Sequence, residues 1–166
     1  MHVTADQMDS AALRRAFGAF PSGVVALCAV VNGSPQGMVA SSFVTVSLDP
    51  PLVAFCVQWT STTWPQLEHL PRIGVSVLGE AHDSVARQLA SKVGNRFADL
   101  PLDVTADGAV FLHGAGAWLD CSVEQVFPAG DHGMVLLRMH ALTIHEGISP
   151  LVFAGSAFRR LAAVAP

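Results

Sequence analysis

The sequence predicts a mainly β protein, an antiparallel barrel that is closed or nearly closed and carries a few short helices. Short apolar runs recur along most of the chain and are separated by clusters of Gly, Pro, Asn and Asp. Only three short stretches have helical spacing, which favours a barrel over a sheet of alternating strands and helices. With 166 residues and no internal repeat or linker, residues 1–166 are assigned to a single domain.

The first predicted element is an amphipathic helix near the N-terminus. Its apolar residues recur at helical spacing, at Leu13, Ala16, Phe17 and Phe20. The sequence Pro-Ser-Gly at 21–23 ends this helix. A buried strand follows at 24–31, VVALCAVV, and then a turn at 32–37, NGSPQG.

The rest of the chain continues as a series of short strands. Further strands are expected at 43–48, 52–57 and 74–78. Short helices are expected at 64–69, where Pro65 is tolerated in the first turn, and at 83–91. A polar, proline-containing loop at 92–107 then leads to two long strands, 117–127 and 133–144, which the turn PAGDH joins.

The composition is rich in apolar residues and poor in charged ones, at 51% and 13%. This balance predicts that a second subunit covers part of the apolar surface, so we expect a homodimer. The formal net charge is -4 at pH 7 and the pI is about 5.9. Because an acidic protein does not attract polyanions, neither nucleic acid nor an anionic membrane is an expected partner. Any phosphate that the protein binds needs a local positive site.

The cysteines, Cys28, Cys56 and Cys121, are odd in number, far apart and embedded in apolar runs. We therefore expect reduced thiols rather than a disulfide framework or a zinc site. The first 15 residues lack the regions of a secretory signal, and the longest apolar run, 23–31, is too short to span a bilayer. These features predict a cytoplasmic protein. The histidines other than His132 show no metal-ligand spacing with partner carboxylates, so no metal is expected.

Residues 40–52, ASSFVTVSLDPPL, contain a strand that is preceded by unusually small residues. Small side chains at 37–42 let a flat ligand lie close to the backbone, whose N–H and C=O groups then bind the edge of the ligand. Ser41 and Ser42 add hydroxyl groups. An isoalloxazine ring has this shape, although small residues here also suit a β-bulge or a tight bend.

Seven segments of the chain resemble, in the same order, the short-chain flavin reductases that supply reduced flavin to two-component monooxygenases. They are FPSGVVALCAV, GMVASSFVTVSLDPPLVAFCV, STTWPQL, GVSVL, KVGNRF, AWLDCSVE and AGDH, and they extend through nearly the whole chain. The resemblance implies an FMN-binding split barrel that assembles as a homodimer, binds FMN or FAD and oxidises NADH or NADPH. It also implies that a flavin-dependent monooxygenase receives the diffusible reduced flavin.

The resemblance further implies which residues contact the flavin ring. The residues along the isoalloxazine edge are Met38, Val39, Ala40, Ser41 and Ser42. Val57 and Gln58 form the next backbone wall. Ser61 and Thr63 hold the flavin phosphate through their hydroxyl groups, a role that is compatible with capping the helix that follows.

The family's flavin-binding loop matches SKVGNRF, which contains Lys92, the only lysine of the chain. Together with Arg87 and Arg96, Lys92 forms the most basic short stretch between the termini, as phosphate recognition requires. We assign Lys92 and Arg96 to the phosphate and Phe97 to packing beside the flavin, whereas Arg87 is assigned a structural role. A solvated surface charge is the alternative for Lys92.

The turn at 130–132, Gly-Asp-His, matches a family signature whose histidine lies on the nicotinamide side of the flavin. We expect His132 to contact the nicotinamide nucleotide over the flavin face opposite Ser41 and Ser42, without transferring a proton in the hydride step. The alternative is an exposed turn residue without a function.

The sequence therefore predicts an NAD(P)H-dependent flavin reductase, an NAD(P)H:flavin oxidoreductase. Two features depart from the family pattern. Trp59 is bulkier than the usual residue, and it either shapes the pocket or covers the dimer seam. The segment between Phe153 and Phe158 is altered, which leaves an alternative function open. If that segment excludes nicotinamide, the chain is a non-catalytic or electron-carrying flavin-binding protein of the same fold. A relative that uses another cofactor, such as haem, has less support.

Overall fold

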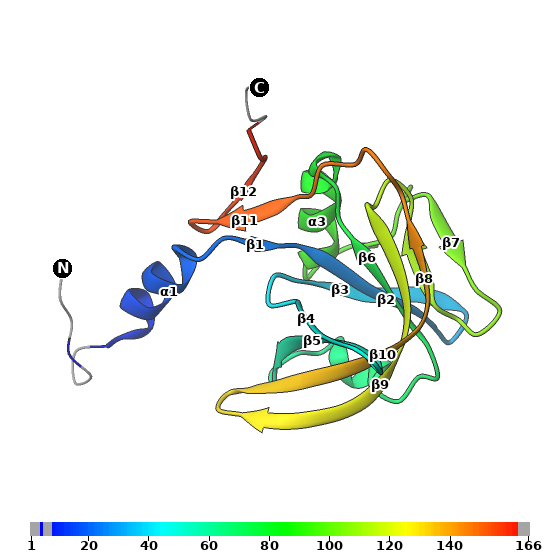
Figure 1. The fold of residues 1–166 in the computed structure, drawn as a ribbon, viewed down its shortest axis with the longest axis horizontal. Helices are drawn as coiled ribbons and strands as arrows, with labels where there is room; N and C mark the ends of the chain where they lie inside the picture. Colours follow the sequence, from blue (N-terminus) through cyan, green and yellow to red (C-terminus); the bar gives the residue numbers. More distant parts are fainter. Residues whose placement is uncertain (1–3, 5–7, 163–166) are drawn as a thin grey trace.

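The computed structural model describes residue 4 and residues 8–162, and its 48% strand and 15% helix confirm the mainly β class. Seven antiparallel strands form the main sheet (Figure 1). In spatial order they are β3 (Ser34–Ala40), β2 (Val25–Val31), β6 (Ile73–Val77), β9 (Ala117–Ala129), β10 (His132–Ile144), β5 (Pro51–Gln58) and β4 (Val44–Leu48). The smaller sheets are β1 (Ser22–Gly23) with β11 (Val152–Ala154) and β12 (Ala157–Arg159), and the pair β7 (Leu102–Val104) and β8 (Val110–Leu112).

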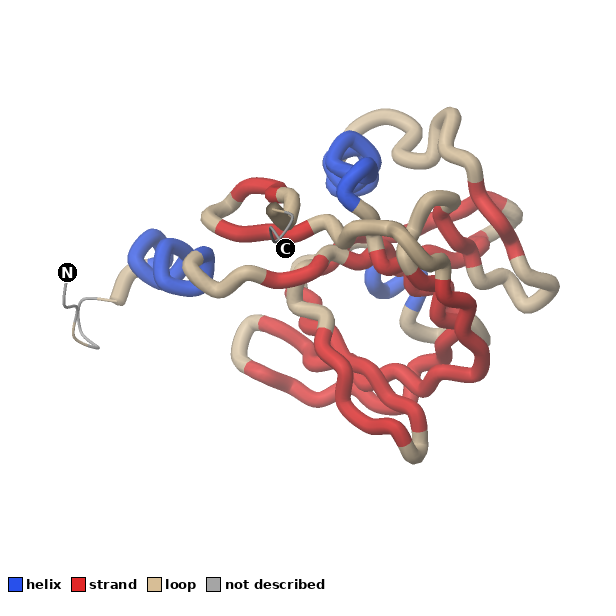
Figure 2. The backbone as a smooth tube through the Cα atoms, turned by 45° about the horizontal axis from the view of Figure 1, so that its top comes forward, coloured by secondary structure: helices blue, strands red, loops and turns tan. Residues whose placement is uncertain are grey.

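The main sheet curls around a core, so that strands from its two ends approach each other (Figure 2). Strands β3 and β5 are in contact although β3 is the first strand in the order and β5 is the last but one. The chain itself crosses the gap, because residues 41–43 connect the edge strand β3 directly to the other edge strand β4. Backbone pairing does not close the sheet at this point, which is compatible with a split barrel.

Strand β2 is buried on both faces because a core lies on each side of it. Val25 and Leu27 pack with Phe55 inside the curled sheet. Ala26 and Cys28 belong to a second core, which includes residues of helix α3 (Asp83–Ala90). Burial on both faces explains why this strand is a continuous apolar run in the sequence.

The helices agree with their predicted positions, but the first one is not packed as its sequence suggests. Helix α1 (Ser10–Gly18) begins at Asp9, whose side chain accepts a hydrogen bond from the backbone N–H of Ala12 at 2.7 Å. None of its residues is buried, and Phe17 is 70% exposed. Figure 1 shows α1 standing apart from the main sheet. Helix α2 (Trp64–Leu67), the short η2 (Glu80–His82) and α3 pack against the body of the fold.

Two predicted loops contain strands. In the predicted turn at 32–37, only Asn32 and Gly33 have positive φ angles, of 50° and 79°, and β3 begins at Ser34. The predicted loop at 92–107 contains β7, and β8 follows it. Strands of three residues, such as β7, β8, β11 and β12, are too short to show an alternating pattern in the sequence.

The three cysteines are free thiols. Burial raises the pKa of Cys28 and that of Cys121 to about 12. Cys56 is partly buried. None of the helices in the described part of the chain is long and apolar enough to cross a membrane.

Candidate functional site

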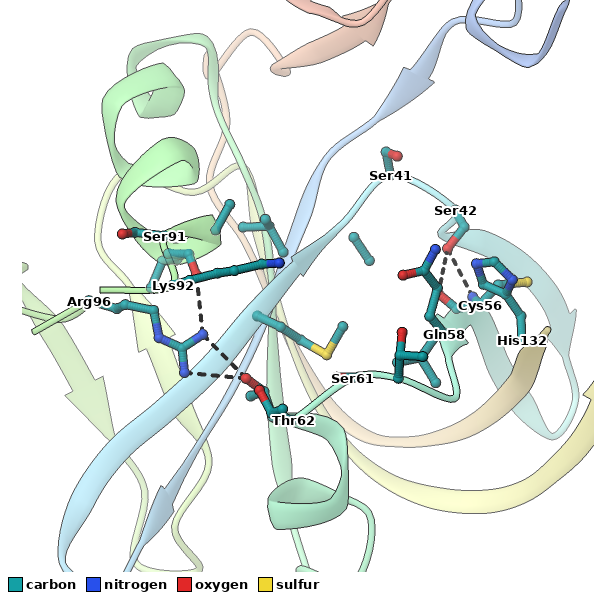
Figure 3. Close-up of a pocket in the computed structure, with 18 of the residues that line it drawn as sticks. Ser41, Ser42, Cys56, Gln58, Ser61, Thr62, Ser91, Lys92, Arg96 and His132 are labelled. Carbon is teal, nitrogen blue, oxygen red and sulfur yellow. Dashed lines mark hydrogen bonds between the residues drawn. The ribbon is translucent and has the colours of Figure 1, made fainter. Parts of the chain in front are cut away.

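A cavity of about 730 Å³ lies where β3 and β5 approach each other, and the segment after α3 forms its third wall (Figure 3). Its lining comes from four parts of the chain that are distant in the sequence. The lining residues are Met38, Val39, Ala40, Ser41, Ser42, Cys56, Val57, Gln58, Thr60, Ser61, Thr62, Thr63, Leu89, Ala90, Ser91, Lys92, Gly94, Arg96 and His132. Two of these side chains are permanent cations and none is a carboxylate, so the cavity is a local positive site in an acidic protein.

Two of the small residues before β4, Gly37 and Ala40, are explained by the packing of the fold. Gly37 lies against β2, where a Cβ atom would be 2.5 Å from the Sγ atom of Cys28. Ala40 is buried in the core of the curled sheet. Between them, Met38 and Val39 belong to an edge strand, which leaves part of their backbone without a strand partner and open to a ligand.

Ser42 holds the crossing segment against β5. Its hydroxyl group donates to the carbonyl oxygen of Cys56 at 3.1 Å and accepts from the backbone N–H of Cys56 at 2.9 Å. Both Ser41 and Ser42 are exposed, but the Ser42 hydroxyl is already used in hydrogen bonds within the protein. Among the described residues, the Ser41 hydroxyl makes no hydrogen bond. Of the two predicted hydroxyl groups, it is therefore the one that can bind a ligand.

Arg96 is held at one end of the cavity by hydrogen bonds that fix its guanidinium group. Both of its terminal nitrogens donate to Oγ1 of Thr63, each at 3.3 Å. One of them also donates to the carbonyl of Leu89 and the other to Oε1 of Gln36, each at 3.4 Å. Lys92 lies at the same end, with its side chain directed into the cavity (Figure 3).

Two hydroxyl groups of the cavity lining, one of them in contact with Arg96, retain a hydrogen that can be donated. The Oγ atom of Ser61 accepts from the backbone N–H of Trp64 at 3.1 Å, as the predicted capping role requires, whereas the side chain of the N-cap residue Thr63 makes no capping bond. The Oγ1 atom of Thr63 accepts from Arg96. A hydroxyl that accepts still carries its own O–H, so both groups can also donate to an anion such as phosphate.

His132 lies at the other end of the cavity and flanks the end of β5. It is the first residue of β10 and is the register partner of Gln58, so β5 separates it from Ser42 on the far side. Its Nδ1 atom is 2.7 Å from Oδ1 of Asp131. The hydrogen bond and the charge of His132 lower the pKa of the Asp131 carboxyl group. Since the carboxylate accepts the hydrogen on Nδ1, Nε2 is the nitrogen that is left for a ligand.

The cavity brings together all of the predicted site residues except Phe97. Phe97 is buried in the core that contains α3, because the turn at Asn95 directs it inward. Two residues that orient the site, Asp131 and Gln36, were not among the predicted site residues. Asp131 could have been found as the neighbour of His132 in the signature, whereas nothing in the sequence indicated the contact between Gln36 and Arg96.

The altered C-terminal segment does not line the cavity. Residues 154–157 form the tight turn between β11 and β12, with Gly155 and Ser156 both at a φ of 60°. Phe153 and Phe158 pack edge to face, with their ring centroids 5.6 Å apart. The backbone N–H of Gly155 donates to the carbonyl of Gly18 at 2.7 Å, so this turn supports the end of α1.

Among the described residues, no group of three or more His, Cys, Asp and Glu side chains is arranged to hold a metal ion.

Residues 17–162 match the model of the flavin reductase like domain, so the chain belongs to this family. The chain is 33% identical to a flavin reductase of Pseudomonas putida over 98% of its own length and 96% of that protein. It is also 33% identical to the reductase subunit of a flavin-dependent monooxygenase from Rhodococcus jostii, over 91% of its own length and 77% of that protein.

A solved structure shares the fold over the full chain. It is an NADH:FAD oxidoreductase of Streptomyces globisporus in complex with NAD and FAD fragments, with 34% identity and a TM-score of 0.91. The alignment covers 100% of this chain and 99% of that one. The family assignment that the sequence motifs suggested is confirmed.

Proposed function

We propose that this flavin reductase transfers a hydride from NADH or NADPH to FMN or FAD bound in the cavity between β3 and β5. The observation that carries the proposal is the division of one cavity into two ends. Lys92 and Arg96 form a cationic end, and His132 and Gln58 form the other. Met38 and Val39 of β3 also line the cavity.

A flavin nucleotide fits the residues that line the cavity. The cavity volume of about 730 Å³ is in the range of cofactor sites. The cations with the hydroxyl groups of Ser61 and Thr63 would hold the phosphate, and the backbone of Met38, Val39 and Ala40 would hold the polar edge of the ring. When bound, the isoalloxazine ring supplies an acceptor for the hydride of the nicotinamide.

The protein contributes positioning rather than acid–base chemistry. The strands fix the ring edge, and His132 would orient the nicotinamide nucleotide through Nε2 while Asp131 holds the imidazole ring. Neither residue needs to transfer a proton in the hydride step. The absence of a carboxylate in the lining also favours the negative charge that develops on the reduced cofactor.

Relatives support the choice of cofactors and of a protein partner. The reductase of Streptomyces globisporus is named for NADH and FAD, and the Rhodococcus jostii relative is a reductase subunit of a flavin-dependent monooxygenase. We infer that this chain supplies reduced flavin to such a monooxygenase. The free thiols fit a reducing compartment, so we place the protein in the cytoplasm.

The test is to mix the protein with NADH or NADPH and with FMN or FAD, in all four pairs, and to follow the nicotinamide absorbance. The proposal predicts oxidation of at least one nucleotide that depends on both flavin and protein. A protein that binds flavin but oxidises neither nucleotide would instead be an electron carrier or a flavin store.

We also propose that the protein is a homodimer whose interface includes β4. On this edge strand Val44 and Val46 are half exposed, and Leu48 is 97% exposed. The unburied apolar face of α1 is a second surface that a partner subunit would cover. Since β4 follows directly from the cavity wall at Ser42, the interface would adjoin the flavin site.

Light scattering tests the dimer. We expect the native protein to have twice the mass of one chain, and Leu48→Glu to shift it towards the monomer because a charge on β4 would be buried in the interface. Val104→Glu is the matched control, since Val104 is also an exposed strand residue, at 55%, but lies on β7. A native monomer at micromolar concentration would contradict the proposal.

A further inference from the structure

Trp59 lies beside the cavity without lining it, directly after the last residue of β5. Its side chain is 50% exposed, so burial alone does not explain the presence of so large a residue. The contacts of Trp59 converge on one feature, here called the turn at 130–133, which consists of Gly130 and Asp131 between β9 and β10 and the first two residues of β10, His132 and Gly133.

Three contacts join Trp59 to this turn. Its backbone N–H donates to the carbonyl of Asp131 at 3.1 Å. Its indole Nε1–H donates to the carbonyl of Gly130 at 3.2 Å. Its ring also lies against Gly133, where an added Cβ atom would be 2.6 Å from Cη2 of the ring. The indole ring can occupy this position only because residue 133 is a glycine.

The turn needs such support because it is the tip of a long hairpin. Strands β9 and β10 have 13 residues each, and residues 128–131 at the tip are exposed. Gly130 has a φ of 64°, a conformation that glycine adopts without strain. Exposed hairpin tips with few packed neighbours are mobile, and a shift there would move His132 relative to the cavity.

We propose that Trp59 is a positioning residue that fixes the turn at 130–133 and so places His132 for the nicotinamide nucleotide. The proposal rests on the proposed function for its kinetic effect only, since the contacts exist whatever the reaction. Trp59 does not contact the reacting atoms, and its effect passes through His132.

The first test compares Trp59→Phe with the native protein. Phenylalanine keeps a ring against Gly133 but cannot donate to Gly130. Losing one hydrogen bond should raise KM for the nicotinamide nucleotide about three- to tenfold and leave the flavin Kd unchanged. Trp118→Phe is the matched control, because Nε1 of Trp118 also donates to a carbonyl, that of Leu112 at 2.8 Å, away from the cavity. We expect no change in KM for Trp118→Phe.

The second test is a double-mutant cycle with His132→Ala. If Trp59 acts through His132, Trp59→Phe should cause no further rise in KM once His132 is removed. Effects that multiply would show that Trp59 acts independently and would overturn the proposal. Gly133→Ala provides a second variant, because its added methyl group would displace the indole ring while Trp59 is still present. It should have the same kinetic effect as Trp59→Phe.

The third test does not depend on activity. The NMR signal of the His132 Cε1–H group should shift and broaden in Trp59→Phe, while that of His140, which is hydrogen-bonded to Ser122 at 2.7 Å, stays unchanged. An unchanged His132 signal would overturn the positioning role even in an active enzyme. A shifted signal in a protein that oxidises neither nucleotide would support the positioning role and reject the proposed function.

Discussion

The two ends of the cavity are built in different ways. At the cationic end, Arg96 is held by Thr63, Gln36 and Leu89, which belong to three separate and partly buried segments. At the other end, His132 is held by Asp131, whose side chain is 89% exposed, on the turn of a protruding hairpin. One end is thus anchored in the body of the fold and the other depends on a surface turn.

This difference suits a protein that binds two nucleotides in turn. A cation fixed in advance needs no rearrangement when it meets a phosphate. The cationic end should therefore distinguish flavins that carry a phosphate from riboflavin. A histidine on a turn can make or lose its contact with a second ligand at little cost to the fold. Changes at the first end should therefore alter flavin affinity, and changes at the second should alter nicotinamide kinetics.

The largest effect is expected at the cationic end. Arg96→Ala and Lys92→Ala each remove a charge from the cavity, and Thr63→Ala removes the main acceptor that orients Arg96. Losing a charge-assisted hydrogen bond costs about 1.5 to 3 kcal/mol, so the Kd for FMN should rise by roughly one to two decades. Titration of flavin fluorescence measures this change.

Riboflavin and a neighbouring arginine provide the controls for these variants. Riboflavin lacks the phosphate, so its Kd should stay nearly constant. Arg87→Ala removes a cation from α3 that pairs with Asp83 at 2.6 Å instead of lining the cavity, and it should bind FMN normally. An equal loss of riboflavin and FMN binding would show that these residues do not recognise the phosphate.

A smaller effect is expected at the other end. His132→Ala removes the imidazole ring and leaves β3 and β5 unchanged. The value of kcat/KM for the nicotinamide nucleotide should fall roughly 5- to 30-fold, which corresponds to about 1 to 2 kcal/mol of transition-state stabilisation. The flavin Kd should not change. Steady-state kinetics equal to those of the native protein would mean that the histidine only joins two strands, and the two ends would then not divide the ligands between them.

The smallest effect concerns Cys56, which lines the cavity beside His132 (Figure 3). At about pH 8, thiol pKa values of about 12 leave roughly one in ten thousand of the Cys28 and Cys121 groups ionised, and both are buried. Alkylation should therefore modify Cys56 first, and saturating FMN should slow it several-fold. Equal rates with and without FMN would place the flavin elsewhere, and Cys56→Ser identifies the modified residue.

The strands that form the barrel were predictable because their burial leaves a pattern in the sequence. The apolar run of β2 and the long alternating segments of β9 and β10 all lie close to their predicted positions. The stripe on α1 was equally clear, yet the described residues leave it exposed. An apolar face shows that a surface will be covered, but it does not show which chain covers it.

The site was predictable as a set of residues but not as a set of contacts. The family motifs identified residues at both ends of the cavity, because each matched segment indicates which residue types line that wall. Hydrogen bonds between distant segments leave no such trace, as with Gln36 and Arg96, which are 60 residues apart. The hydroxyl of Ser42 was assigned to the ligand for the same reason, since its bonds to Cys56 form only when the segment before β4 pairs with β5.

The most direct measurement of the proposed function is a single turnover without oxygen. The protein is loaded with FMN, mixed with increasing concentrations of NADH or NADPH, and followed at the visible absorbance of oxidised flavin. We predict that the flavin bleaches with one nucleotide consumed per flavin, at a rate that saturates with nucleotide and needs a higher concentration in His132→Ala. Bound flavin that stays oxidised at every concentration of both nucleotides would contradict hydride transfer in this cavity.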